Sequence, residues 1–359
     1  MGSPAAIATP SVAIVIDNYN YARYLGAALE SALAQSYDAV RVIVVDDGST
    51  DESRELLSGY ADRVQLVFKE NGGQASAFNA GFAECREDIV MFLDADDVLL
   101  PEAAGLVADR FAREPALVKV QYRLEVIDAA GRPTGEVKPL PHLALPQGDM
   151  RQAELAFSFD LVWLATSGNA FRREAVAELF PIPEDRFRLC ADRYLVHLAA
   201  LLGPVASLDD IGGRYRVHGA NSYEPQSAVV SVANVRNSIG YAAEVSVELE
   251  RVADRIGLTR APGPILSVAD VANRLISLRL DSAQHPRPGD TRSGLLLAGI
   301  RATSRRFDVR PPLRALYDLW FIAMTVAPRR LATRLAGWFL YPSRRSGFNA
   351  LLGRLQRAR

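Results

Sequence analysis

Two carboxylates, Asp94 and Asp96, directly follow an apolar run from Ile89 to Leu93, and one residue separates them, so both could contact the same bound ion. Side chains alternate faces along a strand, so residues two apart can point the same way. Paired carboxylates offer the hard oxygen ligands that a divalent cation prefers, with positions left open for phosphate oxygens. We therefore expect a metal site here. The alternative is that Asp96 and Asp97 only cap a helix starting near Pro101, since Asp is common at such turns.

Two other apolar runs also end in polar residues. Val12 to Ile16 leads into Asp17-Asn18-Tyr19-Asn20, and Val42 to Val45 leads into Asp46-Asp47-Gly48-Ser49. Ser49 and Glu52 have the spacing of a capping box, which predicts a helix start there. Helical patterns between the runs predict an open α/β sheet, in which the carboxyl ends of the strands form the ligand crevice. We therefore expect the three polar clusters to face one pocket.

The ordered motifs along the first hundred residues form one series: Ile14–Asn20, Val44–Asp51, Asn71–Gly81 and Phe92–Asp97. This series resembles the family 2 glycosyltransferases of GT-A fold, and the resemblance extends over roughly residues 10 to 222. It implies an α/β fold with a mixed sheet flanked by helices, and transfer of a sugar from a nucleotide diphosphate to an acceptor hydroxyl. One departure is Asp17, which stands where many members carry Pro-Thr or Thr-Ser.

A donor such as a UDP-, GDP- or TDP-sugar needs stacking and hydrogen bonds for its base and ribose. Tyr19 could stack, and the carboxylates Asp46 and Asp47 could accept hydrogen bonds. Glycines in a loop before a helix permit close approach of phosphate, although Gly-Gly alone is also a simple turn. Ordinary partial burial of Tyr19 and helix capping by Asp46 are the alternatives. The resemblance implies a donor site of Asp17, Tyr19, Asp46, Asp47, Asn71, Gly73, Asn79 and Asp94.

The leaving diphosphate requires positive charge. The resemblance implies that Asp96 is the principal ligand of Mg²⁺ or Mn²⁺, with Asp94 nearer the sugar or ribose and Asp97 a structural neighbour or helix cap. His218 is a candidate third ligand, because neutral imidazole can complete a carboxylate site. A partly buried structural histidine is the alternative. Arg216 could form an ion pair with the negatively charged diphosphate.

The second half of the expected fold must supply an acceptor site and a base. The resemblance implies that Trp163, Gly168 and Asn169 line the donor sugar and acceptor, against the alternative of a core edge strand. It also implies that Asp192 is the catalytic base, at the start of a helix expected over Ala191–Leu202. An Asp is common at any helix N-terminus, and many relatives have Glu where this chain has Ala191.

These roles predict inversion at the anomeric carbon. The Gln-x-x-Arg-Trp signature of processive synthases is absent, so we expect one sugar per encounter. A catalytically silent sugar-nucleotide-binding module is the alternative. A nucleotidyltransferase is more remote, because it would carry a glycine-rich, basic phosphate loop after its first strand.

The composition fits one large domain with an appendage: 359 residues, 49% apolar, with a formal charge of −1. We expect a flexible tail over residues 1–10, a GT-A domain over 11–225 and a helical region over 226–359. The N-terminus lacks the features of a signal peptide, and Cys85 and Cys190 form no disulfide framework. A cytoplasmic enzyme is therefore expected.

Charge is concentrated in the last 59 residues. Residues 301–359 contain 13 arginines and no lysine against two acids, so they carry +11 and the remainder −12. The apolar stretch Leu316–Val326 is too short to span a bilayer. Leu331–Tyr341 sets Leu331, Leu335, Trp338 and Phe339 against arginines, as in an interfacial helix. We expect contact with an anionic membrane that holds a lipid-linked or other glycan acceptor, and no nucleic-acid partner. The alternative is a helix packed on the catalytic domain with its basic face in water.

Overall fold

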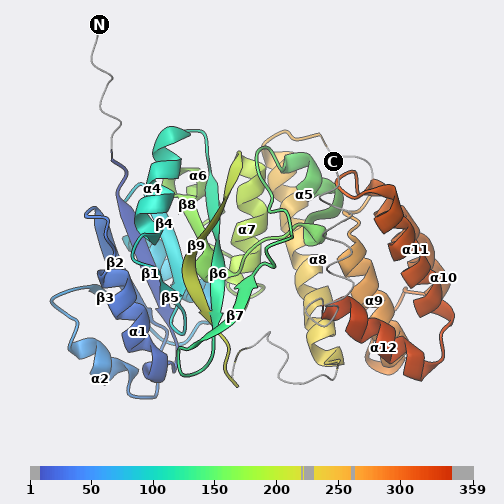
Figure 1. The fold of residues 1–359 in the computed structure, drawn as a ribbon, viewed down its shortest axis with the longest axis horizontal. Coiled ribbons are helices and arrows are strands. Elements are labelled where there is room, and N and C mark those ends of the chain that lie inside the picture. The colour runs from blue at the N-terminus through green and yellow to red at the C-terminus, as the bar shows by residue number, and fades with distance from the viewer. Residues whose placement is uncertain (1–8, 220, 222–229, 260–262, 342–359) are drawn as a thin grey trace, which may run out of the picture. The chain divides into compact units, whose positions relative to one another are not determined.

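The structure, a computed structural model, describes residues 9–219, 221, 230–259 and 263–341. The chain divides into two compact units, one of Met1–Arg151 with Trp163–His218 and the other of Gln152–Val162 with Gly219–Arg359 (Figure 1). The domain boundary expected near Pro225 and most of the expected N-terminal tail lie outside the described residues.

The first unit is built on a mixed sheet with the order β3-β2-β1-β4-β8-β6-β9-β5, in which β7 pairs with β6. Strands β1 to β4 run parallel, and β8 lies antiparallel between β4 and β6. The mixed sheet predicted from the sequence is confirmed. The described strands are β1 Val12–Asn18, β2 Val40–Asp46, β3 Gln65–Phe68, β4 Ile89–Asp94, β5 Val98–Leu99, β6 Lys119–Ile127, β7 Pro133–Lys138, β8 Asn169–Arg172 and β9 Val205–Arg216.

Helices cover both faces of this sheet. On one face, α1 and α4 contribute Leu29 and Phe111 to a core that contains Ile14 and Met91. On the other face α3 packs so closely that a Cβ on Gly81 would lie 2.3 Å from Val15 Cγ1. The bounds are α1 Ala22–Leu33, α2 Ser53–Ser58, α3 Gln74–Glu84, α4 Ala103–Arg113, α6 Arg173–Val176 and α7 Ala191–Leu202.

Two helix starts differ from the sequence prediction. The capping box predicted at Ser49 is wrong, because α2 begins at Ser53 without a side-chain cap. Ser49 Oγ instead accepts hydrogen bonds from Asn18 Nδ2 at 3.1 Å and from Asn20 N at 2.9 Å. Asp97 likewise does not cap α4, which begins at Ala103. In both cases a tertiary partner takes the side chain that the local pattern assigned to a cap.

The register of the parallel strands brings their polar ends together. Asn18 pairs with Asp46, and Asp17 pairs with Asp94. Because these pairs lie at the carboxyl ends of β1, β2 and β4, the three polar clusters share one edge of the sheet, as the sequence predicts.

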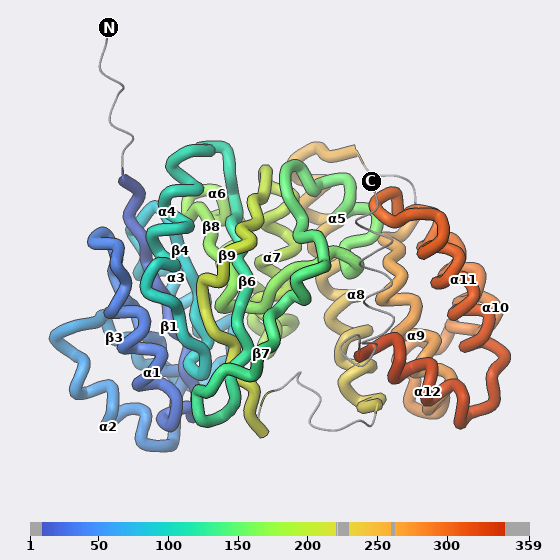
Figure 2. The backbone as a smooth tube through the Cα atoms, in the orientation of Figure 1, coloured from blue at the N-terminus to red at the C-terminus, as the bar shows by residue number. Residues whose placement is uncertain are grey.

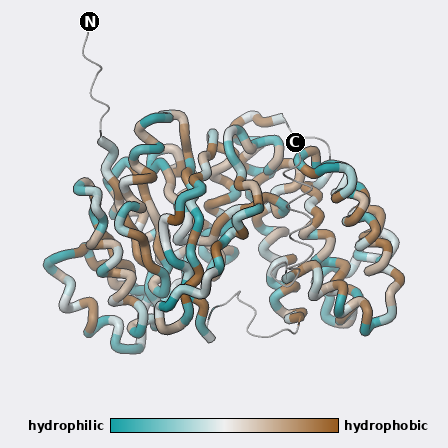
Figure 3. Tube along the Cα trace, viewed as in Figure 1, coloured by the Kyte–Doolittle hydropathy of each residue, from teal (hydrophilic) through white to brown (hydrophobic). Residues whose placement is uncertain are grey.

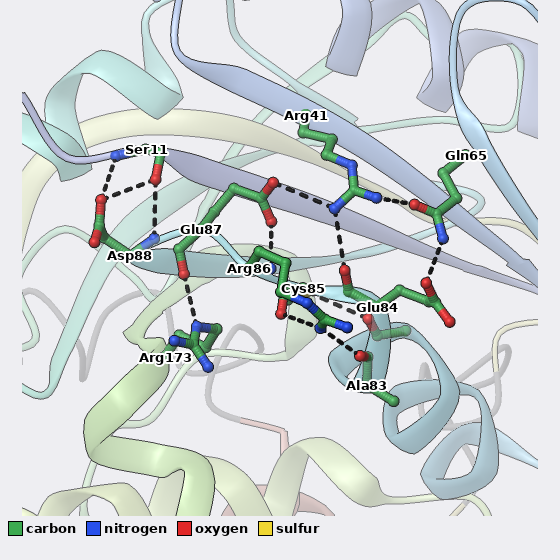
Figure 4. Close-up of polar contacts among 11 residues, drawn as sticks. Ser11, Arg41, Gln65, Ala83, Glu84, Cys85, Arg86, Glu87, Asp88 and Arg173 are labelled. Atoms are coloured by element: carbon green, nitrogen blue, oxygen red, sulfur yellow. Dashed lines mark hydrogen bonds and ion pairs between the residues drawn. The ribbon is translucent and has the colours of Figure 1, made fainter.

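At the opposite edge of the sheet, where β1, β2 and β4 begin (the amino edge), polar groups pair with one another (Figure 4). Arg41 Nη1 donates to Glu84 O at 3.0 Å and lies 3.3 Å from Glu87 Oε1. Asp88 Oδ2 accepts from both the backbone N and the Oγ of Ser11, each at 2.8 Å. Arg41 therefore joins Glu84 and Glu87 at this edge, and Ser11 holds Asp88.

The second unit is helical, as the sequence predicts, and Figure 2 traces its chain. Its helices are α5 Arg151–Phe157, whose first residue belongs to the first unit, α8 Val232–Arg255, α9 Val268–Leu280, α10 Arg292–Arg305, α11 Pro311–Val326 and α12 Arg329–Leu340. None of the helices in the described part of the chain is long and apolar enough to cross a membrane.

A short segment from the middle of the chain joins this helical unit. Asp160 accepts the backbone N–H groups of Val268 and Ala269, both at 2.8 Å, at the start of α9. Its carboxylate also lies 3.2 Å from Arg306 Nη1. A carboxylate at a helix N-terminus satisfies donors that have no partner within the helix. Residues 152–162 are therefore fastened to helices more than a hundred residues later in the chain.

Candidate active site

A cluster of three carboxylates forms where β4 ends. The chain turns at once, with Asp97 N donating to Asp94 O at 3.0 Å. This turn brings one carboxylate oxygen from each of Asp94, Asp96 and Asp97 within 4.8 Å of the others. Three convergent hard oxygens fit a divalent cation such as Mg²⁺ or Mn²⁺. The sequence predicts Asp97 to be a structural neighbour or a helix cap, whereas the turn makes it a member of the cluster.

His218 lies against the cluster. Its Nε2 is 2.8 Å from Asp96 Oδ2, and its ring lies 4.9 Å from the ring of Tyr24 and 5.7 Å from that of Tyr21. The structure therefore brings together Asp96 and His218, two of the residues proposed as metal ligands, although 122 positions separate them. The two tyrosines hold the imidazole in place.

Arg216 supports the turn that carries the cluster. Its backbone N donates to Asp97 Oδ1 at 2.8 Å, and its Nε donates to Asp96 O at 2.7 Å. The guanidinium lies 5.0 Å from the ring of Tyr24, and only 5% of the residue is exposed. These contacts position the carboxylates. A contact of Arg216 with diphosphate stays a prediction.

The carboxylates are crowded enough to change their acidity. Burial raises the pKa of Asp17 to about 8, and the charges of Asp96 and Asp192 add to the rise. Burial also raises the pKa of Asp94 well above its usual range, with the charge of Asp17 the next cause. The pKa of Asp97 is raised in the same way by burial and by Asp96. A bound cation would favour the ionised forms of these groups.

Gln74, the first residue of α3, connects this cluster to α7. Its Nε2 lies 3.3 Å from Asp94 Oδ1 and 3.3 Å from Thr166 Oγ1. Its Oε1 accepts the backbone N–H of Ala191 at 3.0 Å, at the first residue of α7. The sequence reading misses this role, because Gln74 stands in a motif interpreted through its glycines. Its position at the start of a helix after a strand end is the signal that could have found it.

Asp192 lies beside this junction. It is half-buried in the first turn of α7, and its Oδ1 accepts the backbone N–H of Arg193 at 2.7 Å. Burial raises the pKa of Asp192, while Arg193 opposes the rise. The helix bounds Ala191–Leu202 are confirmed. A carboxylate with a raised pKa is a better proton acceptor, which suits a general base.

The glycine loop is organised by Asp47. This carboxylate accepts from Gly72 N at 2.9 Å, from Gly73 N at 2.7 Å and from Lys69 Nζ at 2.6 Å. Gly73 has φ 87°, and a Cβ there would lie 2.4 Å from Arg188 O. Asn71 bonds to the guanidinium of Arg188 through its side-chain oxygen. Asp47, which follows β2, therefore holds the loop that contains Asn71 and Gly73.

The remaining donor-site candidates differ in how open they are. Tyr19 is 45% exposed at the end of β1, so its ring is open to a ligand. Asp46 is buried and accepts from Asn18 Nδ2 at 3.0 Å and from Arg54 Nε at 3.1 Å. Asn79 holds a neighbouring loop, since its amide exchanges two hydrogen bonds with the backbone of Ile182.

The acceptor-motif residues surround the end of β4. Ser167 Oγ accepts from Asp94 N at 3.2 Å, which the sequence reading did not single out. Asn169 Nδ2 donates to Ala165 O at 2.7 Å, and a Cβ on Gly168 would lie 2.7 Å from a carbon of Leu164. The ring of Trp163 lies 3.8 Å from Lys119 Nζ. Gly168 and Asn169 therefore shape the turn beneath Asp94, while Trp163 covers a buried lysine.

Comparison with known proteins agrees with this geometry. The family described as glycosyl transferase family 2 matches residues 13–180. An uncharacterized glycosyltransferase of Nostoc sp. (strain PCC 7120) is 35% identical over 238 residues, which cover 64% of this chain and 71% of that protein. The chain belongs to glycosyl transferase family 2 and is a glycosyltransferase.

Two solved structures resemble the whole fold. The structure of TarS 1–349 of S. aureus in complex with UDP matches this chain with a TM-score of 0.51 at 15% sequence identity. The match covers 90% of this chain and 92% of the TarS chain. The mannosyltransferase PcManGT of Pyrobaculum calidifontis, in complex with GDP-Man and Mn²⁺, has a TM-score of 0.51 at 17% identity, over 95% and 88% of the two chains. The GT-A fold predicted from the sequence is confirmed.

Proposed function

We propose that this protein is an inverting, metal-dependent glycosyltransferase that moves one sugar from a nucleotide diphosphate sugar to an acceptor hydroxyl. The observation that carries the proposal is the cluster of Asp94, Asp96 and Asp97, whose three convergent carboxylate oxygens fit a divalent cation. The similar structures support the donor class, because TarS was solved with UDP and PcManGT with GDP-Man and Mn²⁺.

The three carboxylates, with His218 beside them, would hold Mg²⁺ or Mn²⁺. Such an ion, when bound, acts as a Lewis acid that neutralises charge on the departing diphosphate. Tyr19 would stack on the base, since its ring is exposed at the edge where the strands end. Asp46, Asp47 and the loop of Asn71 and Gly73 would form the rest of the nucleotide site.

Asp192 would be the general base. It takes the proton of the acceptor hydroxyl as that oxygen forms a bond to the anomeric carbon, and the bond from that carbon to the diphosphate oxygen breaks. Attack opposite the leaving group inverts the anomeric configuration. Gln74 would fix the position of Asp94 relative to the start of α7, because it contacts both.

The acceptor is proposed to be a glycan or a lipid-linked glycan, used by a cytoplasmic enzyme at the inner face of the membrane. Trp163, Gly168 and Asn169 belong to the motif proposed for the acceptor side. Addition of one sugar per encounter is proposed because the chain lacks the processive Gln-x-x-Arg-Trp signature.

Incubation with a panel of UDP-, GDP- and TDP-sugars and Mn²⁺ tests the proposal. We expect release of nucleoside diphosphate from one donor class, with loss on chelation, and the opposite anomeric configuration in the product by NMR. Tight donor binding without release under all acceptor conditions would instead identify a silent binding module.

A further inference from the structure

We propose that one face of the second unit docks on the surface of an anionic phospholipid bilayer. This docking face consists of Ala315, Leu319, Ile322 and Val326 on α11, with Leu331, Arg330 and Arg334 on α12. The inference deepens the proposed function, since a lipid-linked acceptor would lie at such a surface, but the surface itself is argued from the helical unit alone.

The apolar part of the docking face is a continuous stripe. Positions 315, 319, 322 and 326 follow the spacing that places residues on one side of a helix. Leu319 is 63% exposed, Ile322 45% and Val326 76%. Exposed apolar residues usually occur singly, whereas a group of them marks an interaction surface. Hydrophobic residues recur along α11 in the hydropathy colouring of Figure 3.

The opposite side of α11 is firmly anchored. Trp320, Phe321 and Met324 are buried in the core of the helical unit. Gly299 allows α10 to approach so closely that a Cβ there would lie 2.6 Å from the ring of Phe321. Arg279 Nε donates to Met324 O at 3.1 Å and fixes the end of the helix. The stripe is therefore presented by a packed scaffold, so docking costs little ordering of the chain.

The helix that the sequence favours for membrane contact is not the one that presents the apolar stripe. Leu335, Trp338 and Phe339 of α12 pack against the core of their own unit. Trp320 Nε1 donates to Leu335 O at 3.1 Å, and the rings of Trp320 and Phe339 lie 4.6 Å apart. Of the four apolar residues named from the sequence, Leu331 is the one that is exposed, at 46%.

Charge decides which partner fits. Arg330 and Arg334 are exposed on α12, next to Leu331. A two-fold contact with a second copy would set this face against itself, and its two arginines would then find no acidic residue of the same face to pair with. Residues 342–359 carry five arginines and no acid, so the chain's own C-terminus would also bring like charges together. An anionic headgroup layer accepts the apolar residues and the arginines at once.

Co-sedimentation of the full-length protein with phosphatidylcholine vesicles, with and without phosphatidylglycerol, tests the proposal. We expect binding that needs the anionic lipid and weakens at high salt. Leu319→Ser with Val326→Ser should weaken it by roughly tenfold or more. Arg330→Gln with Arg334→Gln should weaken it by about fivefold for each engaged arginine.

Matched controls lie on α8. Val247, 55% exposed, and Arg251, whose side chain is 72% exposed, are equivalent in kind but lie outside the docking face. Val247→Ser and Arg251→Gln should leave vesicle binding unchanged, and all four variants should keep the donor hydrolysis measured without vesicles.

Three results would overturn the proposal. The first is vesicle binding unchanged in the Leu319→Ser/Val326→Ser protein. The second is binding lost only when residues 342–359 are removed, which would assign docking to that segment. The third is a vesicle-independent dimer that the same double variant dissociates. Vesicle binding through this face in a protein that releases no nucleoside diphosphate would contradict the proposed function alone.

Discussion

Two groups of carboxylates in this protein differ in what balances their charge. In the helical unit, Asp290 lies 2.9 Å from Arg274 Nε and 3.0 Å from His285 Nε2. Burial would raise the pKa of Asp290, but the hydrogen bonds from Arg274 and His285 hold it below the usual range. At the carboxyl edge of the sheet, burial and neighbouring acids raise the pKa of Asp94 instead.

The contrast distinguishes carboxylates that stabilise the fold from carboxylates that belong to the candidate site. A carboxylate paired with a basic side chain stabilises the fold. The amino edge of the sheet contains another such pair, Arg41 with Glu87. A cluster whose members raise one another's pKa costs folding free energy unless a ligand compensates it. We therefore expect substitutions in the two groups to have opposite consequences for activity and stability.

The largest effect should come from Asp96→Asn. Removing one ligand charge should lower transfer by roughly 10²-fold or more, as for loss of a preorganised electrostatic group. The thermal midpoint of the metal-free protein should stay the same or rise, because repulsion in the cluster falls. Initial rates with saturating donor and calorimetric scans measure the two quantities.

Asp290→Asn is the same substitution at a paired carboxylate, and we expect the opposite effects on activity and stability. It removes the charge that Arg274 and His285 face, so the thermal midpoint of the helical unit should fall while kcat per folded molecule is kept.

An Asp96→Asn protein that transfers sugar at the normal rate would end the metal assignment.

Asp192→Asn should have the next largest effect. Loss of a general base alone should lower kcat by roughly 10²-fold or more, with the KM for the donor nearly unchanged. Because burial raises the pKa of Asp192, the acid limb of the wild-type pH profile should lie above the usual Asp range. Collapse of donor affinity in this variant would make Asp192 a structural residue.

Gln74→Ala should have a smaller effect. Outer-sphere partners of metal ligands typically change affinity or activity by about 10- to 100-fold, so we expect about a tenfold rise in the Mn²⁺ concentration needed for half-maximal rate. Gln121→Ala is the control, since Gln121 is a buried glutamine of the same sheet that bonds to Ser207. Its loss should lower stability without changing the Mn²⁺ requirement. Equal Mn²⁺ dependence in the two variants would contradict the positioning role.

Local patterns predict much of the fold but less of the site. Apolar runs ending in carboxylates identify β1, β2 and β4, because strand periodicity and burial are properties of adjacent residues. The start of α7 at Ala191 is also predicted. The partners of Gln74 lie 20, 92 and 117 positions away, so no local signal reveals them.

The same reason explains the failures. The spacing of Ser49 to Glu52 predicts a helix cap, but Ser49 Oγ instead accepts a hydrogen bond from Asn18 at the end of β1. The sequence around Asp160 likewise gives no local signal of its contact with the start of α9, which lies 108 positions later. Asp97 enters the cluster through a turn geometry that an Asp-Ala-Asp-Asp sequence permits but does not dictate. Tertiary pairing decided each outcome.

The smallest expected effect is on stability against pH. A carboxyl group with a raised pKa in the folded state binds its proton more tightly there than in the unfolded chain. Its stabilising contribution is complete below the unfolded value of about 4 and is lost as pH rises through the folded value. Burial raises the pKa of Asp17 to about 8 and those of Asp94 and Asp97 in the same direction. The metal-free protein should therefore lose stability between about pH 5 and pH 8.

Mn²⁺ should reverse this loss, because it binds the ionised cluster of the folded state. Each kcal/mol regained raises the thermal midpoint by about 2–4 °C in a unit of this size, so calorimetric scans at pH 5 and pH 8, with and without Mn²⁺, can resolve it. Asp290 does not interfere, since a carboxyl group with a lowered pKa titrates below this window. We expect the larger Mn²⁺ shift at pH 8 and its near absence in Asp96→Asn. An equal shift at both pH values, or one that survives in Asp96→Asn, would place the bound Mn²⁺ away from the carboxylate cluster and remove the contrast with Asp290.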